Sequence, residues 1–154
     1  MTSGSEQLRP TSINWLVAGQ PNAFRDRYGA LTDQEWLDLL VHSISNPKID
    51  GIDFPGFPAP EFQQEIHGSA DEVALREGVE FYSFVKQRPY LAAKMAPRSA
   101  FLDFGTGWGR IPRLFMRDFD LSHIYGFEPH LGFCFLARSL NPYICFLNGN
   151  YPAG

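Results

Sequence analysis

The chain has 154 residues, of which 44% are hydrophobic and 19% charged, and its net charge is −4. These values are typical of a single globular domain, and the acidic balance argues against a protein that binds nucleic-acid backbones through a basic face. No run of 18 apolar residues predicts a membrane span, and residues 1–10 lack the apolar core of a secretory signal. Cys134 and Cys145 lack the spacing of a metal site, so we expect reduced core thiols in a cytoplasmic protein.

Residues 1–60 predict an extension of helical and irregular structure. An apolar run at 13–17 can pack on the body of the protein as a strand or turn. A helix is expected over residues 31–45, because Thr32 and Glu35 have the spacing of a capping box and the following apolar residues recur on one helical face. That face consists of Trp36, Leu39, Leu40 and Ile44.

Four prolines and two glycines within residues 46–60 predict a linker, since prolines at this density disfavour a helix or a central strand. Phe54 and Phe57 lie between these residues. We expect the two rings to pin an extended segment onto the surface rather than to line a substrate entrance.

Two helices are expected next. The first covers residues 61–67 and ends at Gly68, and the second covers residues 70–86, with Ser69 and Glu72 in the spacing of another capping box. The apolar face expected for the second helix consists of Leu75, Val79, Phe81, Tyr82, Phe84 and Val85.

The sequence F-L-D-F-G-T-G-W-G-R, which begins at residue 101, organises the rest of the chain. Its first four residues predict the central strand of a sheet. Three glycines at alternate positions (Gly105, Gly107 and Gly109) predict a tight turn, because glycine adopts positive φ and lets a ligand approach the backbone. Residues 111–119 predict a helix whose free N–H groups would face that ligand.

Two further strands are expected over residues 122–127 and 143–147, with a helix over 130–139 between them. The core positions expected on this helix and just after it are Leu131, Cys134, Phe135 and Leu140. The order strand-helix-strand-helix-strand implies parallel pairing through right-handed crossovers. The expected fold class is therefore α/β: a partial Rossmann-like, doubly wound parallel sheet of three strands, preceded by a helical region.

Polar residues stand at the three expected strand ends, where an open α/β sheet binds its ligand. The first strand contributes Asp103 and the glycines, the second contributes Glu128, and the third contributes Asn148 and Asn150. Glu128 follows Gly109 by 19 residues, which places its carboxylate where it can accept both hydroxyls of a ribose. The same geometry serves NAD, so Glu128 alone does not choose a cofactor.

The glycine spacing separates the nucleotide-binding alternatives. In the dinucleotide fingerprint G-x-G-x-x-G the third glycine would fall on Arg110, and no Gly-Lys-Ser/Thr follows for a P-loop. The pattern D-x-G-x-G-x-G instead resembles motif I of the class I S-adenosylmethionine-dependent methyltransferases. Gly126-Phe127-Glu128 is similar to the end of their second strand, and Gly149-Asn150 lies where their third strand ends. The resemblance is to the bacterial small-molecule type and covers residues 61–150.

The resemblance implies a role for each site residue. Asp103 would hold the amino-acid end of S-adenosylmethionine or brace the loop, and Glu128 would hold the ribose. The remaining cofactor-binding residues that it implies are Gly105, Thr106, Gly107, Gly109 and Asn150, the last beside the adenine ring. Tyr82 would line the cofactor from the preceding helix, and the alternative is that Phe81 and Tyr82 are simply core residues.

The function expected from this resemblance is methyl transfer from S-adenosylmethionine to an unidentified acceptor, for which the acidic balance favours a small molecule. Residues 61–154 would be the cofactor-binding half of a methyltransferase domain, truncated after the third strand. We therefore expect an incomplete, weakly active or inactive chain that self-associates or needs a missing half. Two alternatives remain open: a non-catalytic nucleoside-binding or interaction module, and an NAD-binding half. No general base can be named.

Overall fold

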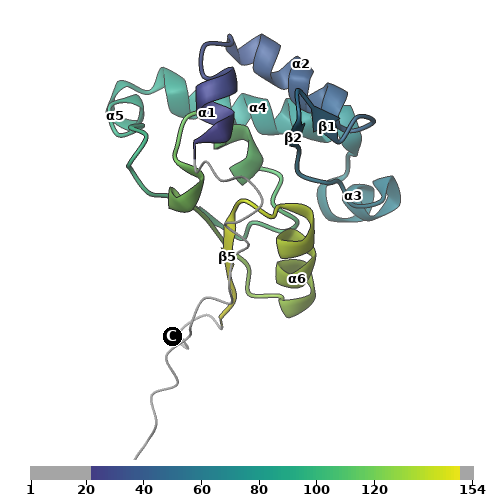
Figure 1. Ribbon diagram of the computed structural model, residues 1–154. Helices are drawn as coiled ribbons and strands as arrows, with labels where there is room; N and C mark the ends of the chain where they lie inside the picture. The colour runs from purple at the N-terminus through teal and green to yellow at the C-terminus, as the bar shows by residue number, and fades with distance from the viewer. Residues whose placement is uncertain (1–21, 150–154) are drawn as a thin grey trace, which may run out of the picture.

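The computed structural model describes residues 22–149. Its helices and strands, in chain order, are α1 (Ala23–Tyr28), α2 (Asp33–Ser43), β1 (Lys48–Ile49), β2 (Ile52–Asp53), α3 (Pro60–His67), α4 (Asp71–Gln87), α5 (Pro89–Ala92), β3 (Phe101–Phe104), β4 (Ile124–Phe127), α6 (Leu131–Leu140) and β5 (Cys145–Leu147). Two short 3-10 helices, Pro112–Phe115 and Leu121–His123, lie between β3 and β4. Figure 1 shows α1, α2, α4 and α5 grouped at one end of the molecule, while α6 lies beside β5.

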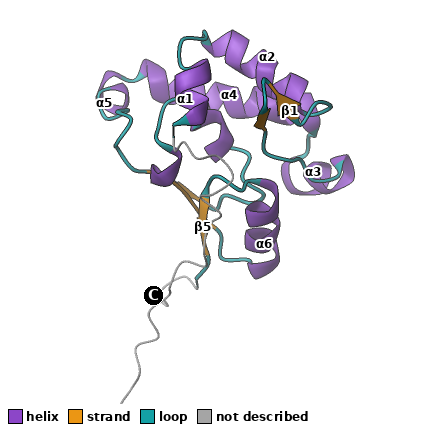
Figure 2. Cartoon of the chain, in the orientation of Figure 1, coloured by secondary structure: helices purple, strands orange, loops and turns teal. Residues whose placement is uncertain are grey.

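The sheet of β3, β4 and β5 confirms the expected α/β class with parallel strands (Figure 2). Asp103 of β3 is paired with Gly126 of β4, which is paired in turn with Phe146 of β5. Among the described residues the middle strand is β4 and β3 lies at an edge, so the prediction that β3 is the central strand is not confirmed. The order places the carboxyl ends of all three strands side by side.

The two faces of this sheet differ in burial. On one face Phe101 stacks on Phe115 with ring centroids 4.2 Å apart, within the hydrophobic core. On the other face Leu102, Phe104 and Leu147 are 55%, 60% and 43% exposed. The residues of a strand alternate between the faces, so the described elements cover one face and leave apolar residues of the other exposed to solvent.

The helix predicted over residues 31–45 is α2, and its predicted cap is confirmed. The Thr32 hydroxyl accepts from the Glu35 backbone N–H, and the Glu35 carboxylate accepts from the Thr32 N–H. Trp36 then anchors the helix in the core, where its indole N–H donates to the Leu114 carbonyl at 2.8 Å.

The expected linker contains a small hairpin, β1 and β2, that the sequence did not predict. Asp50 and Gly51 form its turn with φ values of 52° and 82°, the region that this residue pair favours. Phe54 follows β2 and is buried in the core, which confirms packing rather than a place at an entrance for this ring.

The capping box predicted at the start of α4 is wrong. Ser69 instead donates from its hydroxyl to Glu77, and the N-cap position is taken by the next residue, an alanine without a capping side chain. The amide of Gln63 supplies the cap from α3, because its oxygen accepts from the Asp71 N–H and its nitrogen donates to the Asp71 carboxylate, both at 2.9 Å.

Several aromatic and aliphatic residues predicted in the core are exposed. Phe81 and Phe84 of α4 are 46% and 48% exposed, and Leu131 and Phe135 of α6 are exposed as well. Their neighbours at helical spacing are buried, including Leu75 and Tyr82 on α4 and Cys134 on α6. The periodicity located the buried stripe of each helix but overestimated its width, because each helix contacts the protein along one narrow side.

The helix predicted after the glycine loop is also wrong. Residues 111–119 form turns around the 3-10 helix Pro112–Phe115. Arg113 and Arg117 are buried within this segment, and their guanidinium groups donate to backbone carbonyls of distant segments. Polar contacts on several sides suit a tight, fully buried connection rather than an amphipathic helix with one apolar stripe.

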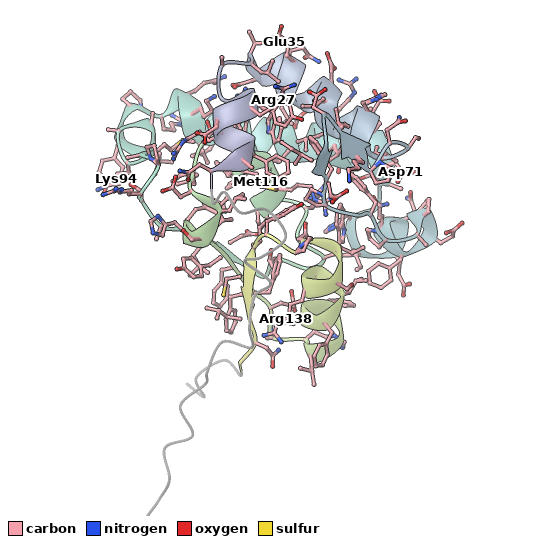
Figure 3. The ribbon with its side chains drawn as sticks, in the orientation of Figure 1. Arg27, Glu35, Asp71, Lys94, Met116 and Arg138 are labelled. Carbon is pink, nitrogen blue, oxygen red and sulfur yellow. The ribbon has the colours of Figure 1, made fainter. Side chains whose placement is uncertain are left out.

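One hydrophobic core joins the described part of the chain and contains residues from both sides of residue 60. Met116 lies in its interior, and Arg138 ties α6 to β5 by donating to the Phe146 carbonyl (Figure 3). The thiols of Cys134 and Cys145 are free. Among the helices of residues 22–149, none combines the length and apolar composition that a membrane crossing requires.

Candidate functional site

The glycine loop lies over the carboxyl end of β4. The N–H groups of Gly105 and Thr106 both donate to the Phe127 carbonyl, at 2.8 and 3.1 Å. Gly105, Gly107 and Gly109 have φ values of 76°, 56° and 86°, as their alternate spacing predicted. Because L-residues with side chains rarely adopt this region, the three glycines are needed for the shape of the turn itself.

The space beside each glycine divides them into two kinds. A Cβ atom at Gly109 would lie 2.6 Å from the Asn141 side chain and 3.0 Å from the Phe146 ring, so this glycine permits close packing. Among the described residues, a Cβ at Gly105 would meet no atom within 4 Å, and one at Gly107 would meet only His67, at 3.9 Å. Gly105 is exposed and therefore presents open backbone that a ligand can approach, whereas Gly107 is buried and its N–H donates to Glu128.

Two buried side chains hold the base of the loop. The Asn141 amide donates to the Trp108 carbonyl at 2.9 Å, and Arg113 donates from Nε to the Gly109 carbonyl at 3.2 Å. Arg113 also donates to the Asn141 side chain at 2.9 Å, so α6 and the segment after the loop are joined beneath it. Sequence reasoning missed both residues, because nothing in their local pattern indicates these distant partners.

The carboxylate of Glu128 braces the loop from the adjacent strand. Its two oxygens accept from the N–H groups of Gly107 and His130, each at 2.9 Å, and the residue is buried. A carboxylate offers about four acceptor positions, so two remain for another donor such as a sugar hydroxyl. The predicted position of Glu128 at the end of β4 is confirmed, and its contact with the loop is new.

Asp103 lies on the same face of the sheet as Glu128. It pairs with Gly126, two residues before Glu128, which puts the two acidic Cα atoms roughly 8 Å apart. Burial raises the pKa of Asp103, Thr106 and Arg110 lower it, and Glu128 raises it further. A single ligand can therefore reach both carboxylates.

The other predicted site residues have different placements. Tyr82 is buried in the core, where its hydroxyl donates to Asp118 at 2.6 Å and its ring packs on Phe115. These contacts are those of a core residue. Asn148 donates to the Glu128 carbonyl at 2.7 Å and so supports that strand end. Asn150 lies outside the described residues.

The structure adds His67, the last residue of α3, to the surroundings of the loop. Its ring lies 6.0 Å from that of Trp108. Burial and Arg110 lower the pKa of His67, and Glu77 opposes them. Arg110 is itself held to α4, since it donates to the Ala74 carbonyl at 3.1 Å and to Glu77 at 3.2 Å. The sequence placed His67 only as a helix end, because its contact with a loop 40 residues later has no local signal.

Comparison with known proteins gave no match: no family model, curated protein or solved structure is similar to this chain. The functional inference therefore depends on the residues themselves.

Buried polar atoms without partners are concentrated at this site. Within residues 22–149, several buried side-chain atoms have no hydrogen-bond partner, and among them are nitrogens of His67, Trp108 and Arg110. Leaving such a group unpaired costs about 1–3 kcal/mol, so their concentration in one place favours a polar ligand there. No cluster of three potential metal-binding side chains occurs among the residues described.

Proposed function

We propose that this chain is the cofactor-binding portion of an S-adenosylmethionine-dependent methyltransferase whose acceptor is a small molecule. The observation that carries the proposal is the open, positive-φ backbone of Gly105 between two carboxylates, Asp103 and Glu128, on one face of the sheet. This arrangement offers separate places for a charged amino-acid end and for a ribose.

The residues present fit such a ligand. The space beside Gly105 admits the backbone approach that the motif requires, and the unpartnered polar atoms around the loop can pair with the ligand's own polar groups. Asp103 would accept from an ammonium group, and the free acceptor positions of Glu128 would take the ribose hydroxyls. Glu128 can do so while it continues to hold the Gly107 N–H.

The cofactor supplies an electrophilic methyl group next to a sulfonium. Methyl transfer is an in-line displacement, so the contribution expected from this chain is orientation and exclusion of water. The loop is held from below by Arg113 and Asn141 and from the side by Glu128, which fixes the position of the bound amino-acid end. A base is needed only where the acceptor must lose a proton.

The sheet supports a doubly wound architecture with a second half. Two right-handed crossovers that step across a sheet in the same direction place their connections on the same face. The order β3, β4, β5 has two such steps, and the exposed Leu102 and Leu147 lie on the opposite face. In a complete doubly wound sheet, the helices of the other half would cover that face.

An NAD-binding half is the competing enzyme class. In that fingerprint the position of Arg110 would hold a glycine that packs closely against the strand. Arg110 instead extends to α4, where it donates to the Ala74 carbonyl and to Glu77. The close packing that the third glycine of the fingerprint permits is therefore absent at this position. A non-catalytic nucleoside-binding module would share the loop and would differ only in lacking transfer.

Calorimetric titration with S-adenosylhomocysteine and with NADH tests the proposal. We expect micromolar binding of the first ligand alone. Gly105→Asn should weaken that binding by at least about tenfold, or about 1.4 kcal/mol, because asparagine tolerates the local φ but places a side chain against the ligand.

Gly51→Asn is the matched control. Gly51 also has a positive φ and open space beside its Cα, but it lies in the β1–β2 turn. Binding of NADH would overturn the proposal. So would equal affinity for S-adenosylhomocysteine in both variants and the unaltered protein. Binding of adenosine without any methyl transfer in the complete protein would favour the nucleoside-binding module.

A further inference from the structure

His67 and Arg110 form a pair of nitrogen-bearing side chains beside the second glycine of the loop. The His67 Cε1 atom lies 3.9 Å from the position that a Cβ at Gly107 would take. Gly68, in the left-handed region with φ 75°, turns the chain immediately after this histidine and ends α3 there. The imidazole is therefore placed by a helix end, with Trp108 against its ring.

The Arg110 guanidinium is held in one orientation. One terminal nitrogen donates to Ala74 and to Glu77, and Glu77 is fixed in turn by the Ser69 hydroxyl at 2.6 Å. These bonds use one terminal nitrogen of the guanidinium. The Nε atom of Arg110 and the Nε2 atom of His67 are both buried and have no hydrogen-bond partner among the described residues. Both nitrogens can donate a hydrogen bond, and together they match a group that only accepts.

We propose that His67 and Arg110 hold the carboxylate of the ligand's amino-acid end. The inference rests on the proposed function and refines it, because it divides the two charges of that end between different elements. Asp103 takes the ammonium, while the nitrogens of His67 and Arg110 take the carboxylate. Asp103 and Arg110 interact electrostatically, so they lie near one another, as the two charged groups of an amino acid do.

This assignment predicts a pH dependence. The charged groups that act on the His67 imidazole are Arg110 from the loop and Glu77 from α4, and burial together with Arg110 holds its pKa below the usual value. A bound carboxylate favours the protonated ring, so a proton is taken up on binding. Affinity for a ligand with the carboxylate should therefore increase as the pH falls from about 8 to about 6.

The test compares S-adenosylhomocysteine with 5′-deoxy-5′-(3-aminopropylthio)adenosine, which keeps the amine but lacks the carboxylate. We expect His67→Phe and Arg110→Gln each to weaken the first ligand about tenfold, the effect of losing a hydrogen bond to a charged group, and to change the second by less than about twofold. His67→Phe should also remove the pH dependence. His42→Phe on α2 and Arg76→Gln on α4 are the controls, because both lie on exposed positions.

His67→Phe retains a ring against Trp108, so it decides the question even where Arg110→Gln loosens α4. Equal losses for both ligands, or no loss for either, would overturn the assignment and leave the cofactor proposal intact. If the unaltered protein binds neither ligand, both proposals fail.

Discussion

The polar network around Tyr82 and the glycine loop are both built from buried polar groups, and they differ in how those groups are paired. In the network, Arg117 donates to the Tyr82 hydroxyl, to the Leu31 and Thr32 carbonyls and to Asp33. No side-chain atom of Tyr82 or Arg117 is among the unpartnered atoms found in the described residues. In the loop, by contrast, Trp108 and Arg110 each have a buried nitrogen without a hydrogen-bond partner among those residues.

This difference indicates which buried polar groups serve the fold and which serve a ligand. The Tyr82 hydroxyl donates to Asp118 while it accepts from Arg117, so the network is complete within the chain and fixes α2, α4 and the segment after the loop to one another. The unpaired groups around the loop reduce the stability of the ligand-free protein. Such a cost is expected where a binding site is prepared in advance.

Removing the centre of the network should give the largest effect on stability. Arg117→Met leaves the Leu31 and Thr32 carbonyls without the donor seen in the structure and removes the bonds from Arg117 to the Tyr82 hydroxyl and Asp33. Breaking a buried, hydrogen-bonded charge in this way should lower the free energy of unfolding by about 3 kcal/mol, measured by urea denaturation. Arg76→Met on α4 removes an exposed pair with Glu72 and should cost less than about 0.5 kcal/mol. Equal losses for the two variants would contradict a structural role for the network.

The loop glycines should show two different effects of intermediate size. Gly109→Ala places a Cβ against Asn141 and Phe146 at positive φ and should destabilise the protein by about 2 kcal/mol. Gly105→Ala has the strained φ without a clash and should cost about 1 kcal/mol. Thermal and urea unfolding measure both. If Gly105→Ala were the more destabilising change, the space beside Gly105 could not be open.

The smallest effect on stability is expected at Asp103. Burial raises its pKa in the folded state, so the carboxylate is destabilising above that pKa, and this cost disappears as the pH falls toward the value in the unfolded chain. Asp103→Asn should therefore increase stability slightly at pH 7, and this gain should disappear below about pH 3. It should also weaken the binding of S-adenosylhomocysteine.

Unfolding curves at a series of pH values test this effect. Asp38→Asn, at an exposed position on α2, is the matched control. A loss of stability at pH 7 in Asp103→Asn would show that the carboxylate supports the fold rather than a ligand.

The sequence predicted the elements whose signals are local. Thr32 and Glu35 cap α2 as expected, and the glycines after Asp103 adopt the predicted positive φ. The capping box predicted for α4 failed because the amide of Gln63, eight residues before Asp71, caps the start of this helix in place of Ser69. The helix expected after the loop failed because Arg113 and Arg117 find their partners in segments far away along the chain.

The sequence by itself determined the strand-turn connection after Asp103, the place of Glu128 at the next strand end and the parallel α/β class, because steric limits on φ and side-chain alternation act between near neighbours. Only the tertiary structure decided that Tyr82 belongs to the core and that His67 lies beside Gly107. Those outcomes depend on how α3 and α4 pack against the loop, and packing joins residues whose separation along the chain leaves no pattern to read.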